Sequence, residues 1–276
     1  MTAPSDDAEA GAREPFADAE LYDHEYRHRR ADVNFYRGLV ANRMEFTDGP
    51  VLDLGCGSGR LLFPLVRDGH HVLGLDLSRA MLARAGARAR RLSATRRSHV
   101  SLIQADLRRF SLVPRFTMAI CAFHGIQHLY TNADLLAFLR NVRAALLPGG
   151  WLAFDVLPPD QDWLYRDPNR RYARTQVRHP VTGQRFIYTT NHTYDSESRL
   201  LHMRLFYQPV DEDGHPSGDE ILVRLCHRQL WPSDGKRLLK QAGFNVLGTF
   251  AGFDGRALDD FPEAADDHIY LASVPR

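Results

Sequence analysis

Residues 51–60, with the sequence VLDLGCGSGR, narrow the choice of fold more than any other part of the chain. A short apolar segment typical of a buried strand runs into three alternate glycines, Gly55, Gly57 and Gly59, and then into a helix-like stretch. Glycines at such a turn let the backbone approach a ligand without obstruction by Cβ atoms. A strand that enters a helix in this way is typical of an open α/β sheet with a ligand at the carboxyl end of the strand.

The chain after this turn continues to alternate between strand and helix. Short apolar strands and helices follow one another with connections of a few residues, which predicts a doubly wound α/β fold with helices on both faces of a parallel sheet. The predicted strands are 51–54, 71–77, 100–104, 116–123, 151–157, 245–250 and 268–274. The predicted helices are 60–68, 79–92, 134–147 and 233–242.

Three segments interrupt the alternation. Residues 184–194, 199–210 and 220–231 are rich in Thr, Tyr, Phe, Val and Ile and are separated by turn clusters, which predicts a three-stranded antiparallel insertion. Acidic and small residues at the N-terminus predict a disordered tail. We therefore expect a disordered tail (1–18), an N-terminal helical cap (19–46), the main α/β domain (47–160 and 231–276) and the antiparallel insertion (161–230), which forms a lid or a dimer surface.

Composition and charge restrict the function. The 276 residues include 35 Lys and Arg and 34 Asp and Glu, so the formal net charge of +1 gives no support to non-specific nucleic-acid binding. No run approaches the ~18 apolar residues of a membrane span, and the N-terminus has no apolar core of a signal peptide. The three cysteines, Cys56, Cys121 and Cys226, are not spaced as a disulfide framework or a zinc site. We expect a cytoplasmic protein without a metal site.

Carboxylates near the strand ends indicate the kind of ligand. Asp53 lies two residues before the first glycine, where a carboxylate would repel a pyrophosphate but suits an ammonium group. The dinucleotide fingerprint G-x-G-x-x-G would need a glycine at Arg60, so a nicotinamide dehydrogenase is disfavoured. Asp76 ends the next strand at the same edge, where it can accept the hydroxyls of a ribose, and Asp106 lies where an adenine edge can be recognised.

The segments VLDLGCGSGR, GLDLS, QADL, the run ending in CAF and LLPGGWLAFDV resemble class I S-adenosylmethionine-dependent methyltransferases in their order and spacing over residues 51–157. The resemblance implies a seven-stranded sheet whose last strand is antiparallel, and S-adenosylmethionine (SAM) as the cofactor. It also implies that the glycine turn surrounds the methionine part, that Asp76 holds the ribose and that Phe123 offers backbone to the methionine ammonium. The implied cofactor residues are Asp53, Gly55, Cys56, Gly57, Gly59, Asp76, Leu77, Met81, Asp106, Leu107 and Phe123, with Tyr22 and Tyr36 as further candidates.

Within this family the chain is similar to small-molecule N-methyltransferases, including dimethyltransferases of amino-deoxysugars. The similarity rests on the Tyr-Asp-x-x-Tyr motif at 22–26, on the antiparallel insertion and on Leu-Cys-His-Arg at 225–228, which we place at the opening of the next helix. The stretch 29–36 departs from the sugar enzymes and leaves another substrate branch open. We therefore predict methyl transfer to a nitrogen, or with less support an oxygen, of a small-molecule acceptor.

Two histidines are candidates for the general base that an amine or hydroxyl acceptor usually needs. His124 and His128 lie in the loop after the fourth strand, beside the expected methyl group, and imidazole titrates near neutral pH. We rank His128 first, because it aligns with a histidine of some sugar N-methyltransferases. Tyr22, Tyr26 and Tyr36 either close over the cofactor and orient the substrate or only pack a helix.

The acceptor and the partners are less constrained by the sequence. An anionic acceptor is one hypothesis, supported by four arginines after the fifth strand: Arg166, Arg170, Arg171 and Arg174. A homodimer through the insertion is one reading of that segment. The alternatives to a small-molecule enzyme are an RNA methyltransferase, for which no appended RNA-binding module is visible, and a non-catalytic SAM-binding regulator, which needs the glycine turn but no base.

Overall fold

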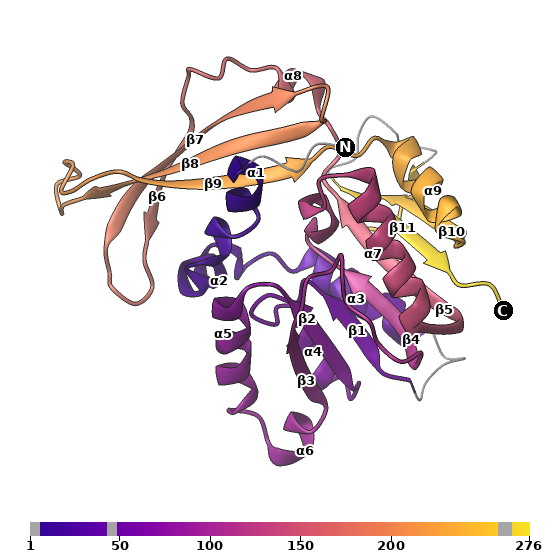
Figure 1. Cartoon of the computed structure of the whole chain (residues 1–276). Helices are drawn as coiled ribbons and strands as arrows, with labels where there is room; N and C mark the ends of the chain where they lie inside the picture. The colour runs from indigo at the N-terminus through magenta and orange to yellow at the C-terminus, as the bar shows by residue number, and fades with distance from the viewer. Residues whose placement is uncertain (1–5, 43–48, 259–266) are drawn as a thin grey trace. The chain divides into compact units, whose positions relative to one another are not determined.

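The structure, a computed structural model, describes residues 6–42, 49–258 and 267–276. The chain divides into two compact units (Figure 1). The smaller unit contains residues 1–28 and 159–229, and the larger unit contains residues 29–158 and 230–276. In the parts of the chain that the structure describes, no helix is both long and apolar enough to cross a membrane.

The larger unit is built on a seven-stranded sheet with the strand order β10-β11-β5-β4-β1-β2-β3. β11 runs antiparallel to both of its neighbours, and the remaining pairs are parallel. The prediction of a doubly wound sheet with an antiparallel last strand is confirmed. The strands are β1 (Val51–Leu54), β2 (Val72–Asp76), β3 (Val100–Gln104), β4 (Phe116–Cys121), β5 (Leu146–Val156), β10 (Asn245–Ala251) and β11 (His268–Ser273).

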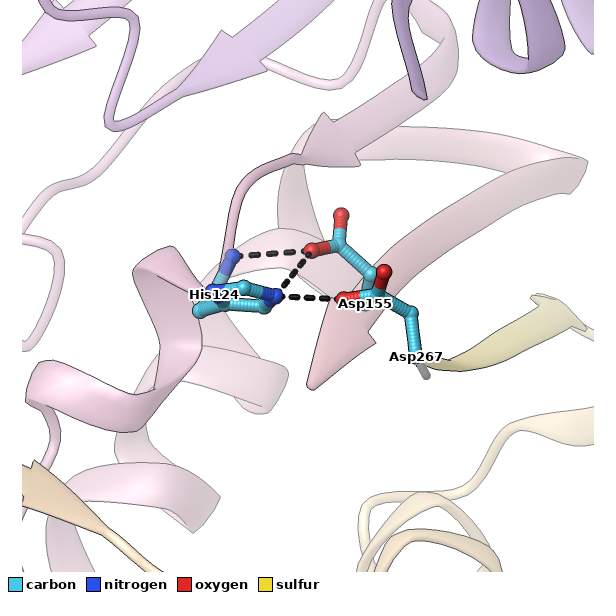
Figure 2. A group of neighbouring side chains, drawn as sticks. All are labelled: His124, Asp155 and Asp267. Carbon is cyan, nitrogen blue, oxygen red and sulfur yellow. Dashed lines mark hydrogen bonds and ion pairs between the residues drawn. The ribbon is translucent and has the colours of Figure 1, made fainter. Parts of the chain in front are cut away.

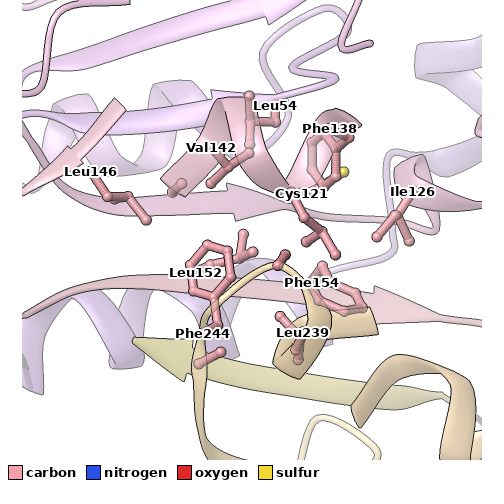
Figure 3. Packing of buried hydrophobic residues seen from close by; sticks show 14 of the residues in the cluster. Leu54, Cys121, Ile126, Phe138, Val142, Leu146, Leu152, Phe154, Leu239 and Phe244 are labelled. Atoms are coloured by element: carbon pink, nitrogen blue, oxygen red, sulfur yellow. The ribbon is translucent and has the colours of Figure 1, made fainter. Parts of the chain in front are cut away.

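Helices cover both faces of this sheet, and each face has its own apolar core. β4 shows why: Ala119 and Cys121 belong to one core cluster, whereas Met118 and Ile120 belong to the other, so a central strand must be apolar throughout. The first core packs α7 (Asn132–Ala145) and α9 (Pro232–Gln241) on the sheet (Figure 3). The second packs α3 (Ala31–Asn42), α4 (Leu62–Arg67) and α5 (Arg79–Ala89). Short helices α6 (Ala94–Arg97) and η3 (Gly125–His128) complete the unit.

The smaller unit contains a four-stranded antiparallel sheet with the order β6-β7-β8-β9. Its strands are β6 (Tyr172–Arg178), β7 (Arg185–Asp195), β8 (Leu200–Val210) and β9 (Ile221–Arg228), and its helical segments are α1 (Asp6–Gly11), η1 (Glu14–Phe16), α2 (Ala19–Tyr26) and α8 (Gln161–Leu164). The prediction of three strands is therefore wrong by one. β6 has no apolar alternation because it is an edge strand whose residues are mostly exposed. Residues 225–228, expected at a helix start, lie in β9.

The expected disordered tail is also corrected, although residues 1–5 lie outside the described part. Residues 6–18 include α1 and η1 and pack on β9. Ala8 is fully buried, and a Cβ on Gly11 would lie 2.6 Å from the backbone nitrogen of Cys226. Glu14 accepts a hydrogen bond from the backbone N–H of Arg224 at 2.7 Å and pairs with its guanidinium. These contacts order a segment whose composition alone indicates disorder.

The expected cap over residues 19–46 does not form one piece. α2 belongs to the smaller unit and α3 to the larger one, and residues 43–46 lie outside the described part. The expected insertion, 161–230, differs by only a residue or two from the observed 159–229. Its role as a lid or a dimer surface stays a prediction.

Two glycines in helices of the larger unit should respond oppositely to replacement by alanine. A Cβ on Gly235, in α9, would lie 2.4 Å from the Tyr270 ring, whereas a Cβ on Gly86, in α5, would approach nothing closer than 3.8 Å. We expect Gly86→Ala to raise the free energy of unfolding by up to about 1 kcal/mol, through helix propensity. We expect Gly235→Ala to lower it by about 1–2 kcal/mol, because the clash outweighs that gain. Urea denaturation followed by circular dichroism measures both, and equal signs would contradict the packing described here.

Candidate active site

The glycine turn after β1 lies open at two of its three glycines. Gly55, Gly57 and Gly59 all have positive φ (72°, 54° and 88°), which glycine adopts without steric cost. A Cβ on Gly55 or Gly57 would meet nothing within 4 Å, whereas one on Gly59 would lie 2.4 Å from the ring of Phe63. Gly59 therefore serves packing, and the other two glycines border open space. Cys56 is 5% exposed, its N–H donates to the Leu75 carbonyl at 2.9 Å, and its carbonyl accepts from the Gly59 N–H at 2.9 Å, so this residue holds the turn in shape.

Asp53 is a buried carboxylate beside this turn. It is 2% exposed, and its Oδ2 has no hydrogen-bond partner among the described residues. Burial raises the pKa of Asp53 to about 7, against the opposing charge of Arg60 and with a further increase from Asp76. A buried polar atom without a partner is costly unless a ligand satisfies it. An orphaned carboxylate oxygen next to two open glycines fits a ligand with an ammonium group and thus fits the amino-acid part of SAM.

Asp76 connects the end of β2 to the glycine turn. Its Oδ2 accepts a hydrogen bond from the Gly57 N–H and its Oδ1 accepts one from the Ser78 N–H, both at 2.7 Å. Burial raises the pKa of Asp76, and these hydrogen bonds oppose the rise. Ser78 caps α5 by accepting from the Met81 N–H at 3.3 Å. Leu77 is 40% exposed, as a side chain that lines a ligand can be, whereas Met81 is buried.

Asp106 is held by a residue that the sequence analysis missed. Its carboxylate accepts from the backbone N–H of Arg108 at 2.9 Å and from the guanidinium of Arg108 at 2.7–3.0 Å. Burial acts to raise the pKa of Asp106, but these hydrogen bonds outweigh it and hold the pKa below its usual value. Leu107 is half-buried and packs against the first core cluster. The side chain of Asp106 is thus occupied, while the segment lies at the end of β3 as predicted.

The chain leaves β4 through two consecutive left-handed residues. Phe123 and His124 have φ of 59° and 60°, a conformation that costs roughly 1–2 kcal/mol for each non-glycine residue. Asp155, at the end of β5, holds both: it accepts from the Phe123 N–H at 2.9 Å and from the His124 N–H at 2.8 Å. Its Oδ1 also accepts from the Tyr36 hydroxyl at 2.5 Å. Strain of this kind persists where surrounding contacts impose it, and it gathers at functional sites.

The imidazole of His124 is enclosed by two carboxylates. Its Nε2 lies 2.5 Å from Oδ1 of Asp267 and 3.7 Å from Oδ2 of Asp155 (Figure 2). His124, Asp155 and Asp267 are all buried. Tyr36 is fully buried as well, and burial together with Asp155 raises the pKa of its hydroxyl well above the usual value. Tyr36 and His124 thus meet around Asp155, and the one sign of this residue in the sequence is an acidic side chain at the end of a central strand.

His128 lies at the end of η3, on the same loop. It is partly buried, and burial, together with the charge of His124, lowers its pKa to about 4. His128 is therefore neutral at neutral pH. The loop is anchored by Gln127, whose side chain accepts from the Leu157 N–H at 2.8 Å and donates to the Leu157 carbonyl at 3.3 Å.

Two arginines contact the ring of Phe123. Arg60 lies 4.5 Å and Arg29 5.1 Å from the ring centroid, measured from the guanidinium carbon. Arg60 also binds the carboxylate of Asp32 through two hydrogen bonds of 2.9 and 2.5 Å. Arg60, which stands where a dinucleotide fingerprint would have its third glycine, thus connects the glycine turn to α3.

The remaining candidates lie in the smaller unit. Tyr22 packs its ring against Tyr26 at 4.7 Å and against Phe16 at 5.6 Å. Arg171 is neutralised by Glu220, which accepts two hydrogen bonds of 2.7 and 2.9 Å. Among the other arginines of the predicted cluster, Arg166 and Arg170 stack on Tyr172.

The strand order, the antiparallel last strand and the glycine turn between two carboxylates define a Rossmann-like methyltransferase of class I. A family model described as a methyltransferase domain matches residues 51–150. The dTDP-3-amino-3,4,6-trideoxy-alpha-D-glucopyranose N,N-dimethyltransferase of Streptomyces venezuelae is 30% identical over 168 residues, which cover 58% of this chain and 67% of that protein. The chain belongs to the SAM-dependent methyltransferases, and SAM is its cofactor. This assignment overturns the dehydrogenase alternative.

Two further proteins extend the comparison. The dTDP-3-amino-3,6-dideoxy-alpha-D-glucopyranose N,N-dimethyltransferase of Streptomyces fradiae is 33% identical over 139 residues, or 48% of this chain, so the match spans half the length of that relative. The solved structure of the CcbJ methyltransferase from Streptomyces caelestis superposes with a TM-score of 0.76 at 20% identity, covering 99% of this chain and 100% of that one. The shared fold extends over both units.

Proposed function

We propose that this protein transfers a methyl group from SAM to a nitrogen of a small-molecule acceptor. The observation that carries the proposal is the orphaned Oδ2 of Asp53 beside Gly55 and Gly57, which matches the charge and shape of the methionine end of SAM. The transfer to nitrogen rests on two of the relatives, which are N,N-dimethyltransferases of dTDP-linked amino-deoxysugars.

The proposed mechanism relies on positioning. SAM supplies an electrophilic methyl group on a sulfonium that leaves as a neutral thioether, so the protein need not stabilise an anionic leaving group. Asp53 and the open glycines bind the methionine end, and Asp76 takes the ribose. Holding reactants in line can contribute roughly 7–11 kcal/mol at best. His128, which is neutral at neutral pH, accepts a hydrogen bond from the acceptor amine. This hydrogen bond orients the amine so that the lone pair of its nitrogen faces the methyl group.

Several finer features belong to the same proposal. The acceptor is an amino sugar or a related amine, and Arg166, Arg170 and Arg174 bind an anionic group on it, with Arg171 already paired to Glu220. Tyr22 and Tyr26 contact the cofactor or the acceptor. The antiparallel sheet acts as a lid or as a homodimer surface. The protein works in the cytoplasm.

The proposal is tested by binding and turnover with His128→Ala. We expect calorimetry to show binding of S-adenosylhomocysteine to the wild-type protein, and incubation with SAM and a panel of amines, phenols and RNA to give an N-methylated amine. His128→Ala should lower kcat about a hundredfold, because the amine loses the group that orients it toward the methyl group, and change cofactor affinity little. His215→Ala, at an exposed side chain in the turn after β8, is the control and should be neutral.

Three outcomes would contradict this proposal. Methylation of RNA or of phenols alone would assign another acceptor, and cofactor binding without any turnover would favour a regulatory protein. Unchanged kcat in His128→Ala would remove that residue from the mechanism while leaving the methyl transfer itself in place.

A further inference from the structure

The carboxylate of Asp155 controls the backbone at the end of β4. It accepts from two successive backbone N–H groups, those of Phe123 and His124, and from the hydroxyl of Tyr36 on α3. Both of its oxygens are therefore engaged, from two different elements. Phe123 and His124, whose N–H groups it accepts, are two of the four non-glycine residues with positive φ in the described part of the chain.

The direction of these N–H groups fixes the direction of two carbonyl groups. In a planar trans peptide the C=O points opposite to the N–H, and the described chain has no cis peptide bond. When the N–H groups of Phe123 and His124 point at Asp155, the carbonyls of Ala122 and Phe123 must point away from it. Without Asp155, a left-handed pair of non-glycine residues would relax to a more common conformation and turn these carbonyls elsewhere.

The sheet order shows what lies on the opposite side. β4 lies between β5, which carries Asp155, and β1, which carries Asp53 and leads into the glycine turn. A Cβ on Gly125, just after the left-handed pair, would lie 3.9 Å from the carbonyl oxygen of Leu54, so this loop borders the end of β1. Carbonyls that point away from β5 are therefore turned toward the side of the glycine turn.

We propose that Asp155 is a positioning residue for the cofactor: through the double left-handed turn it directs the carbonyl of Phe123 toward the ammonium group of the methionine part. This inference rests on the proposed SAM site. The carbonyl of Ala122 accepts a hydrogen bond from the Gly125 N–H at 3.4 Å. His124 contributes its backbone N–H to the turn, and its imidazole braces Asp155 and Asp267 instead of reaching the acceptor.

A metal ion is the competing explanation for the same side chains. Ligand atoms of His124, Asp155 and Asp267 lie within 4.8 Å of one another, which is a spacing that an ion could bridge. The hydrogen bonds favour the positioning role, because Asp155 already accepts three of them and the imidazole Nε2 lies 2.5 Å from Asp267.

The test compares two ligands that differ in the amino-acid part. S-adenosylhomocysteine has the ammonium group, whereas 5′-methylthioadenosine shares the nucleoside and thioether without it. In Asp155→Asn an amide NH2 must face one of the donors, so the turn loses a hydrogen bond. We expect calorimetry to show that Asp155→Asn weakens S-adenosylhomocysteine binding about tenfold or more, the usual effect of disturbing hydrogen bonds to a charged group, and changes 5′-methylthioadenosine binding less than twofold.

Two further variants keep the test decisive if Asp155→Asn does not fold. Tyr36→Phe removes one hydrogen bond to Asp155 and should produce a smaller selective loss of the same kind. His124→Gly keeps the backbone N–H that Asp155 accepts and suits a positive φ, but it removes the imidazole that braces Asp155. It should therefore cause a selective loss of S-adenosylhomocysteine affinity that is smaller than the loss in Asp155→Asn.

The outcomes separate this inference from the function on which it rests. Equal losses for both ligands, or no loss for either, would overturn the role of Asp155. Loss of wild-type S-adenosylhomocysteine affinity after treatment with EDTA would assign the cluster to a metal ion instead. Failure of the wild-type protein to bind either ligand would overturn the proposed SAM site itself.

Discussion

Gly57→Ala will leave the protein folded and weaken its binding of S-adenosylhomocysteine by about tenfold or more. Gly57 has a φ of 54°, and a Cβ there meets no protein atom within 4 Å. The new methyl group therefore enters the space that we assign to the cofactor. Forcing an extra methyl group into a packed contact costs about 1–3 kcal/mol, and each 1.4 kcal/mol is a factor of ten in affinity. Calorimetry measures the loss.

Gly69→Ala is the matched control for this variant. Gly69 lies between α4 and β2, also has a positive φ (102°) and also leaves a Cβ in open space. Both variants should lower the free energy of unfolding by a similar amount, about 1–2 kcal/mol from the left-handed conformation. Gly57→Ala alone should lose cofactor affinity. Equal affinities in the two variants would mean that the cofactor does not approach Gly57.

The parallel sheet and the glycine turn could be predicted because they depend on local patterns. β1 and β3 have the expected bounds, Val51–Leu54 and Val100–Gln104, since short apolar runs between glycines and helices have few other arrangements. β4 could be placed because a strand between two core layers needs apolar residues on both faces. β11 could be placed for the same reason, since Tyr270 and Ala272 belong to one core cluster and Leu271 to the other.

The smaller unit shows where local patterns fail. β6 is exposed along most of its length and pairs with one neighbour, β7, so its sequence carries no apolar periodicity. α1 has only six residues and is held by contacts with β9, about 210 residues further along the chain. An isolated helix of that length is unstable, so its order depends on a partner that composition does not reveal.

The centre around Asp155 was missed for a related reason. Asp155 lies 31 residues from His124 and 119 from Tyr36, and Asp267 lies 143 residues from His124. Each of these residues is ordinary in its own segment: a strand end, a loop, a helix and the residue before the last strand. Their significance arises only when the sheet order brings β4, β5 and β11 together. The left-handed conformation of Phe123 and His124 could not be predicted either, because neither residue is a glycine or an asparagine, the types that commonly adopt it.

Asp53 should make cofactor affinity depend on pH. Burial raises its pKa to about 7 in the free protein, and an ammonium group binds the ionised carboxylate. At pH 6 about a tenth of the protein carries ionised Asp53, and at pH 8 about nine tenths, so affinity for S-adenosylhomocysteine should rise about tenfold across this range. Proton release on binding, measured by calorimetry in buffers of different ionisation enthalpy, should accompany the rise near pH 6.5.

Asp53→Asn should remove this pH dependence and weaken binding at pH 8, while it stabilises the protein without cofactor. The folded pKa of Asp53 lies above the unfolded value of 3.8, so the wild-type protein without cofactor loses stability as the pH rises from about 4 to 7 and the buried carboxylate ionises. That cost reaches about 4 kcal/mol for a shift of this size, and asparagine avoids it. We therefore expect Asp53→Asn to raise the free energy of unfolding at pH 8 and to lower ligand affinity. This pair of effects is typical of a residue that serves binding and reduces stability. A pH dependence that persists in Asp53→Asn would show that another group, and not this carboxylate, meets the ammonium.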